Sequence, residues 1–186
     1  MRRLSVDAEV MRTEFAGHPH ITVVPEGWEP YERYTVHYGL RGVVLSPPGQ
    51  PSWSEAHTAS IVLPAAYPRQ KPFCTMQTPI FHPNFGAIQG EEICLGDYWT
   101  PAQTLPDIVV KIGQMIQYQV YNVRSPLNAV AARWTAGNEA LFPVGEIQLF
   151  QAEPEVTLQA LAPSPEPGPT THQAASAADA GPGDRT

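Results

Sequence analysis

Apolar residues recur at two different spacings along this 186-residue chain, and each spacing predicts a type of element. Near the N-terminus they are spaced as on one face of a helix. The residues of this face are Leu4, Ala8, Met11 and Phe15. Gly17 and Pro19 follow closely and are expected to end the helix. The sequence therefore predicts a short N-terminal helix.

The next part of the chain alternates apolar and smaller or polar residues, which is the pattern of strands with one buried face. Strand-like runs cover residues 21–24, 33–45, 56–63 and 73–77. Prolines and a glycine between the second and third runs, at residues 47–53, predict a turn. We therefore expect an antiparallel meander of four strands.

Beyond residue 100 the apolar spacing returns to that of a helix. One stripe comprises Leu105, Ile108, Val109, Ile112, Met115, Ile116 and Val120. Thr104 is a suitable N-cap, with Asp107 three residues further on. A second helix is predicted within residues 127–142, with Asn128 near its start and Trp134 on its apolar side. A helix, four strands, an irregular segment and two helices together define an α+β fold class.

Composition changes near residue 151. Residues 1–150 carry ten basic and 13 acidic residues, whereas residues 151–186 carry one arginine and five acidic residues and are rich in proline and alanine. The second segment cannot bury enough apolar surface to offset its ordering entropy, so we predict one domain followed by a disordered tail. A net charge of −7 without a basic stripe argues against nucleic acid as a partner.

The two cysteines, Cys74 and Cys94, are too few for a disulfide framework and fit a reducing compartment. The sequence has neither the apolar region of a secretory signal nor an apolar run long enough to span a membrane, so we expect a cytoplasmic protein. Only two lysines occur, Lys71 and Lys111. Either an arginine-rich composition or selection against amines near a reactive acyl group explains this scarcity.

Candidate chemistry is concentrated in residues 80–99, where His82, Asn84 and Cys94 occur among turn-forming residues. Each has an ordinary explanation by itself, because a cysteine is often a small buried residue and histidine and asparagine are common in turns. Together they suggest a nucleophilic thiol with supporting polar groups. The pair His18 and His20 has no third ligand at a suitable spacing, so we predict neither a metal site nor a cofactor.

Five motifs, taken in the order in which they occur, indicate a protein family. They are YPRQKPF at 67–73, HPN at 82–84, ICL at 93–95, WTPAQTL at 99–105 and SPLNAVAARW at 125–134. In this order they resemble the ubiquitin-conjugating enzyme family, from about residue 3 to residue 142. The fold of that family has an N-terminal helix, a four-stranded antiparallel meander and C-terminal helices, which agrees with the elements predicted above.

The resemblance implies a role for each matching residue. Cys94 matches the cysteine that accepts the C-terminal carboxyl of a ubiquitin-like protein as a thioester, and a thiolate is both a good nucleophile and a good leaving group. Asn84 matches the asparagine that supports the active-site loop and is able to hydrogen-bond the developing oxyanion. His82 matches a mainly structural histidine. Ser125 matches a position, often acidic in the family, that guards the approach of the acceptor amine.

Other positions depart from the family pattern. Ser125 carries no charge, and Gly96 stands where the family usually has an aspartate. Arg69 replaces an aromatic residue that docks RING-type ligases, although Pro101 and Ala102 of the same surface are retained. We therefore expect a remodelled active-site gate and do not expect the usual contact with a RING-type ligase.

As partners, the resemblance implies a ubiquitin-like modifier, an activating enzyme and a protein substrate. The composition favours a bacterial source, in which similar proteins are encoded beside an activating enzyme, a ubiquitin-like protein and a metalloprotease, with antiphage defence as a candidate role. A non-catalytic module of the same fold that binds a ubiquitin-like protein is the main alternative, although such variants lack the cysteine. An unrelated thiol hydrolase would need a His–Asp pairing that nothing in the sequence marks.

Overall fold

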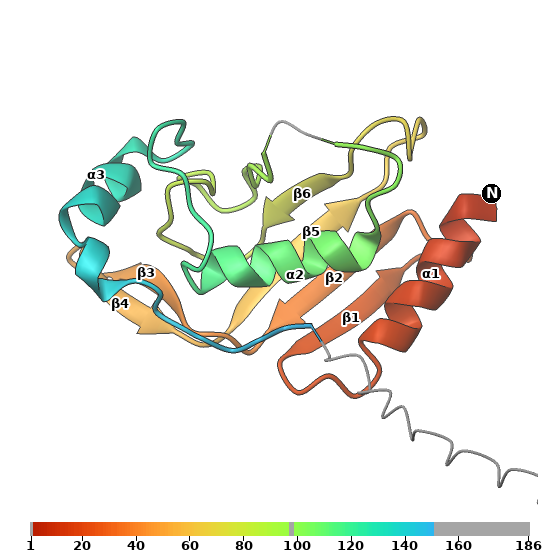
Figure 1. Cartoon of the computed structure of the whole chain (residues 1–186), viewed down its shortest axis with the longest axis horizontal. Helices are drawn as coiled ribbons and strands as arrows, with labels where there is room; N and C mark the ends of the chain where they lie inside the picture. The colour runs from red at the N-terminus through yellow and green to blue at the C-terminus, as the bar shows by residue number, and fades with distance from the viewer. Residues whose placement is uncertain (1, 97–98, 151–186) are drawn as a thin grey trace, which may run out of the picture. The chain divides into compact units, whose positions relative to one another are not determined.

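The computed structural model describes residues 2–96 and 99–150. The predicted disordered tail, residues 151–186, lies outside the described residues. The N-terminal helix is confirmed: α1 spans Arg2–Glu14 and packs through Met11, which is 1% exposed (Figure 1). Gly17 follows the helix with φ of +68°, a backbone conformation that glycine adopts readily and other residues rarely do.

Four strands form the predicted meander. They are β1 (Ile21–Glu26), β2 (Arg33–Tyr38), β5 (His57–Val62) and β6 (Phe73–Met76). Neighbouring strands pair antiparallel in the order β1-β2-β5-β6. Every second residue of β2 and β5 is buried, which is why the alternation was visible in the sequence.

The run at residues 33–45, predicted as one strand, is in fact two strands in different sheets. After β2 the chain leaves the meander, and β3 (Gly42–Ser46) pairs with β4 (Gln50–Ser54) as a separate hairpin. The predicted turn therefore contributes a strand of its own. Leu40, just after β2, is buried in the main core, whereas Val43 of β3 is buried in a second apolar cluster, so apolar residues continue across the break.

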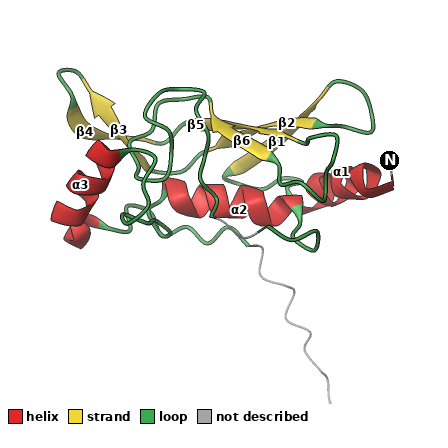
Figure 2. Cartoon of the chain, turned by 90° about the horizontal axis from the view of Figure 1, so that it is seen from above, coloured by secondary structure: helices red, strands yellow, loops and turns green. Residues whose placement is uncertain are grey.

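Helix α2 (Leu105–Ile116) is confirmed together with its cap. The hydroxyl oxygen of Thr104 accepts the N–H of Asp107 at 3.3 Å, and a carboxylate oxygen of Asp107 accepts the N–H of Thr104 at 2.9 Å. The apolar stripe of α2 faces the sheet, and Figure 2 shows the strands as one layer with α1 and α2 below them. The main core lies between these layers.

The predicted end of this helix was wrong. Val120 lies beyond α2 and is 41% exposed, because Tyr118 adopts a left-handed conformation with φ of +57°. Tertiary contacts hold Tyr118 there: its hydroxyl donates to the carbonyl oxygen of Phe81 at 2.6 Å, and its ring stacks on Phe142 with centroids 4.3 Å apart. These contacts offset the strain that a non-glycine residue has in this region of backbone space.

The last helix is shorter than the range 127–142 in which it was predicted. α3 spans Ala129–Gly137 and is followed by the short 3-10 turn η1 (Glu139–Leu141). The side-chain oxygen of Asn128 accepts the N–H groups of Val130 and Ala131, so Asn128 is the N-cap. No helix within residues 2–96 and 99–150 is long and apolar enough to cross a bilayer.

Candidate active site

Residues 80–96 form an irregular segment that runs beside the end of β6 and contains three of the four predicted site residues. The N–H of Ile93 donates to the carbonyl oxygen of Cys74 in β6 at 2.8 Å. One residue further on, the N–H of Cys94 donates to the carbonyl oxygen of Asn84 at 2.9 Å. The main chain of Cys94 is thereby joined both to the sheet and to the His-Pro-Asn turn, and its side chain is half-buried.

The carboxamide of Asn84 is 4% exposed and fully engaged with the loop between α2 and α3. Its Oδ1 accepts the N–H of Asn122 at 2.7 Å. Its Nδ2 donates to the carbonyl oxygen of Asn122 at 2.9 Å and to that of Ser125 at 3.4 Å. Because all of these partners are main-chain atoms, Asn84 fixes the position of this loop relative to the segment that carries Cys94.

His82 is completely buried in the same turn. Its Nδ1 accepts the N–H of Asn84 at 3.0 Å, so the neutral ring carries its proton on Nε2. Burial lowers the pKa of His82 to about 3, and its ring lies edge-on to Phe85 and Tyr118 at centroid distances of 4.9 and 4.4 Å. A neutral, enclosed imidazole whose Nδ1 lone pair is in use is suited to a structural role and not to proton transfer.

Ser125 lies on the facing loop with its residue exposed to solvent. Its carbonyl oxygen is the atom that the Asn84 amide contacts, at 3.4 Å. The structure thus brings His82, Asn84 and Cys94 together in one segment, and Asn84 joins Ser125 to them through the main chain.

Two residues without a predicted role also contact this segment, and they are the two lysines of the chain. Lys111, on α2, donates from Nζ to the carbonyl oxygen of Leu95, the residue after Cys94. Lys71 forms an ion pair with Glu92 at 3.3 Å, two residues before Cys94. Both lysines line one small cavity beside Leu95. This placement does not fit selection against amines near the thiol, and the sequence carried no signal that pointed to these contacts.

The histidine pair near the N-terminus has a structural role. Nδ1 of His18 accepts the N–H groups of His20 and Ile21 at 3.1 and 3.0 Å. Within the described ranges 2–96 and 99–150, no group of three or more His, Cys, Asp and Glu side chains is placed to hold a metal ion.

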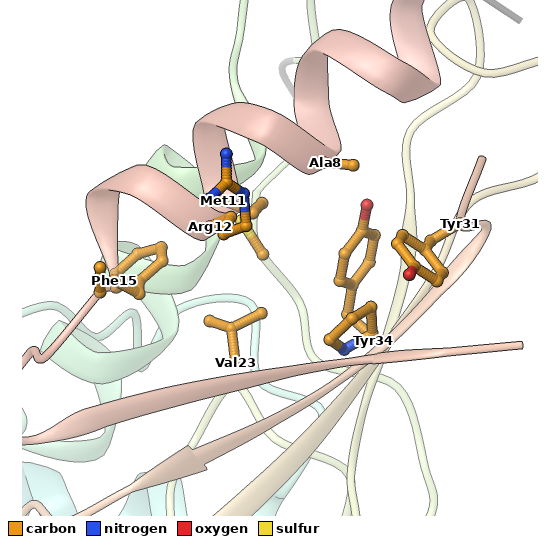
Figure 3. Close-up of a pocket in the computed structure, with 9 residues that line it drawn as sticks. Ala8, Met11, Arg12, Phe15, Val23, Tyr31 and Tyr34 are labelled. Atoms are coloured by element: carbon orange, nitrogen blue, oxygen red, sulfur yellow. The ribbon is translucent and has the colours of Figure 1, made fainter. Parts of the chain in front are cut away.

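A cavity of about 360 Å³ lies between α1 and the sheet, in a different part of the protein (Figure 3). Met11 of α1 and Phe15, the residue directly after α1, line it from one side, and Val23 and Tyr34 of the strands line it from the other. None of its lining residues belongs to residues 80–96. It is therefore not part of the candidate active site.

The family of the chain follows from a comparison of its sequence with family models. The model for ubiquitin-conjugating enzymes matches residues 24–144, which is most of the folded part and includes the whole candidate site. This chain therefore belongs to the ubiquitin-conjugating enzyme family.

Individual relatives agree with this assignment. The ubiquitin-conjugating enzyme E2 PEX4 of Gibberella zeae is 39% identical over 83 residues, which cover 42% of this chain and 46% of that protein. The ubiquitin-conjugating enzyme E2 27 of Arabidopsis thaliana is 30% identical over 106 residues, which cover 55% of this chain and 54% of that protein. The chain thus spans about half the length of the relatives it matches, and both of these relatives are eukaryotic.

A solved structure supports the fold. The E2 domain of a ubiquitin-conjugating enzyme from Toxoplasma gondii superposes with a TM-score of 0.54 and 23% sequence identity. The superposition covers 77% of this chain and 91% of that domain. The arrangement of an N-terminal helix, a four-stranded antiparallel sheet and C-terminal helices is therefore the fold of the family.

Proposed function

We propose that this protein accepts a ubiquitin-like protein from an activating enzyme as a thioester on Cys94 and passes it to an amine acceptor. The observation that carries the proposal is that Cys94 is present in a chain of the ubiquitin-conjugating enzyme family and is hydrogen-bonded through its main-chain N–H to Asn84 of the His-Pro-Asn turn. Cys94 is half-buried and so is not enclosed in the core, in contrast to Cys74, which supports its role as the thiol that meets a second protein.

The reaction has two acyl transfers. In charging, the Cys94 thiol loses its proton to solvent, its thiolate attacks the C-terminal carbonyl of the modifier, the bond from that carbonyl to the activating enzyme breaks, and the group released on that enzyme takes up a proton. In discharge, an amine attacks the thioester carbonyl, the C–S bond breaks, the thiolate leaves and the amine loses a proton to solvent. Both steps pass through a tetrahedral oxyanion, so the groups around Cys94 must hold the thioester in one geometry.

Asn84 acts in this scheme mainly by positioning. Its amide already donates to two main-chain carbonyls of the α2–α3 loop. The bond to Ser125, at 3.4 Å, is the weaker of the two and is the one that a developing oxyanion can replace. The acceptor amine then approaches past a Ser125 that carries no charge.

The partners are proposed to be a ubiquitin-like modifier, its activating enzyme and a protein substrate, without a RING-type ligase. Arg69 is exposed, and it stands where the family often has a docking aromatic residue. Loss of a buried aromatic anchor typically costs an interface about 2 kcal/mol or more. A bacterial source, a role in antiphage defence and a cytoplasmic location stay predictions of the sequence.

The test is a charging assay that contains the activating enzyme, the modifier and this protein. We expect an adduct that reducing agents remove, that is absent in Cys94→Ala and that persists in Cys74→Ala. Cys94→Ser is expected to trap an ester that resists thiols. Charging that survives in Cys94→Ala would overturn the proposal and favour the alternative, a non-catalytic module that binds the modifier.

A further inference from the structure

Lys111 contacts the main chain of the Cys94 segment through its side chain. It lies in the middle of α2 and its side chain is half-buried. Its ammonium donates to the carbonyl oxygen of Leu95, the residue directly after Cys94. A Cβ atom placed on Gly96 would lie 3.7 Å from the same ammonium, so Lys111 lies next to two successive residues of the segment.

The two sides of Cys94 are held by different means. On its N-terminal side, Ile93 is bonded to β6 through its main chain, and the N–H of Cys94 itself is bonded to Asn84. On its C-terminal side Gly96, two residues further on, has φ of +102°, a backbone conformation that glycine adopts readily. The bond from Lys111 to Leu95 lies between Cys94 and this glycine. A hydrogen bond from an ammonium is stronger than one between neutral groups, so it is suited to hold this short stretch in place.

We propose that Lys111 is a positioning residue for the Cys94 nucleophile. By fixing the peptide group of Leu95, it sets the direction in which the chain leaves Cys94 and so the orientation of the thiol. A misplacement of a reacting group by about 1 Å can cost up to about a hundredfold in rate, so a single anchor beside the nucleophile is sufficient to matter. This inference rests on the function proposed above.

Lys71 provides a matched control. It lines the same cavity and carries the same charge, but its partner is the exposed carboxylate of Glu92. Exposed ion pairs contribute little to stability, so the loss of this one leaves the segment in place. Lys71→Met and Lys111→Met change the net charge of the protein by the same amount and remove different contacts.

The experiment measures structure and chemistry separately in the full-length protein. Hydrogen exchange of peptides that contain residues 91–96 reports whether the segment is held, and it needs no partner protein. We expect exchange of the Cys94 amide to rise several-fold in Lys111→Met and to stay unchanged in Lys71→Met. In single-turnover charging we expect Lys111→Met to be about tenfold slower than the wild type. Lys111→Arg keeps a cationic donor and is expected to restore most of the rate.

The outcomes separate the two proposals. If Lys111→Met leaves exchange unchanged, or raises exchange without slowing the charging reaction, the positioning role is wrong. If the wild type itself forms no thioester with the modifier, the proposed function fails. The hydrogen-exchange measurement still decides whether Lys111 holds the segment. Should Lys111→Met lower the melting temperature, Lys111→Gln replaces it as the neutral variant, and the recovery of charging in Lys111→Arg remains the deciding comparison.

Discussion

The two cysteines of this protein lie in neighbouring segments, because the N–H of Ile93, the residue before Cys94, donates to the carbonyl oxygen of Cys74. Their surroundings nevertheless differ. Cys74 is in β6, paired with Ile61 of β5, and is 2% exposed. Burial raises the pKa of its thiol to about 12, so it is protonated at any physiological pH. Cys94 is half-buried in an irregular segment. The same residue type thus stands in two different surroundings: the Cys74 thiol is enclosed in the core and kept protonated, whereas Cys94 is only partly covered.

The two regions are also stabilised by different interactions. The region of Cys74 is held by strand pairing and by apolar burial. The region of Cys94 also places Phe85 and Ile93 in the apolar core, but it is held in addition by the buried polar side chains of His82 and Asn84, which bond to main-chain groups. The first region also supports the second, since the carbonyl oxygen of Cys74 accepts the N–H of Ile93. Changes to polar residues are therefore expected to affect the Cys94 region selectively.

The largest expected difference is in the rate of alkylation. At pH 8 a thiol whose pKa is about 12 is ionised in roughly one molecule in ten thousand. We therefore expect iodoacetamide to modify Cys94 at least about a hundredfold faster than Cys74 in the folded protein. Mass spectrometry of the two peptides after timed labelling measures both rates. Labelling in denaturant is the control, in which the two rates should converge; comparable rates in the folded protein would remove the distinction between the two regions.

The next effect is a loss of stability in acid that originates at His82. Its pKa is about 3 in the folded protein and near 6.5 when unfolded, so its stabilising contribution is present above pH 6.5 and is lost as the pH falls toward 3. At pH 4 this loss amounts to about 3 kcal/mol. Burial also lowers the pKa of His57, so the wild type must be compared with a variant that lacks only His82.

Urea unfolding at pH 7 and pH 4 measures this effect in the wild type and in His82→Asn. Asparagine retains an acceptor for the N–H of Asn84 but does not titrate in this range. The wild type should lose about 3 kcal/mol more between the two pH values than the variant does. An equal loss in the two proteins would show that protonation of His82 is not what destabilises the fold in acid.

A smaller effect is expected from the removal of the Asn84 carboxamide. Asn84→Ala breaks the contacts to Asn122 and Ser125 and should slow discharge to an amine about tenfold, with a weaker effect on charging. Single-turnover assays measure the two steps separately. Asn122→Ala is the comparison variant, because it removes the carboxamide whose Oδ1 accepts the N–H of Arg124 in the same loop but keeps the main-chain atoms that Asn84 contacts. If the rate of discharge is unchanged in Asn84→Ala, the role of Asn84 is only to stabilise the His-Pro-Asn turn.

The smallest effect is expected at Ser125. A carboxylate at this exposed position favours the approach of a cationic acceptor, and interactions between exposed charges are worth up to about 1 kcal/mol. Ser125→Asp should therefore raise the rate of discharge to free lysine about two- to threefold at low salt, and the gain should shrink at high salt. Ser125→Asn, which adds a side chain of similar size without charge, should match the wild type. A rate for Ser125→Asp at or below that of the wild type contradicts the expectation.

The sequence by itself determined the elements of the fold. The helical spacing of Leu105 to Ile116 and the alternation in β2 and β5 are local patterns, and each matches the burial of one face. The caps Thr104 and Asn128 were also readable, because a cap bonds to main-chain groups only two or three residues away. The occurrence of His-Pro-Asn and Cys94 together among turn-forming residues, in order with the flanking motifs, identified the segment that carries the candidate site.

Only the tertiary structure decided where that segment is anchored. The run at residues 33–45 is divided between two sheets because its two halves pack into different apolar clusters, and apolar residues continue across the break. The left-handed conformation of Tyr118 is likewise held by residues distant in sequence. The contacts of Asn84 with residues 122–125, and of Lys111 with Leu95, join segments that no periodicity connects. Hydrogen bonds between distant segments depend on how the whole chain packs, so they leave no local signal in the sequence.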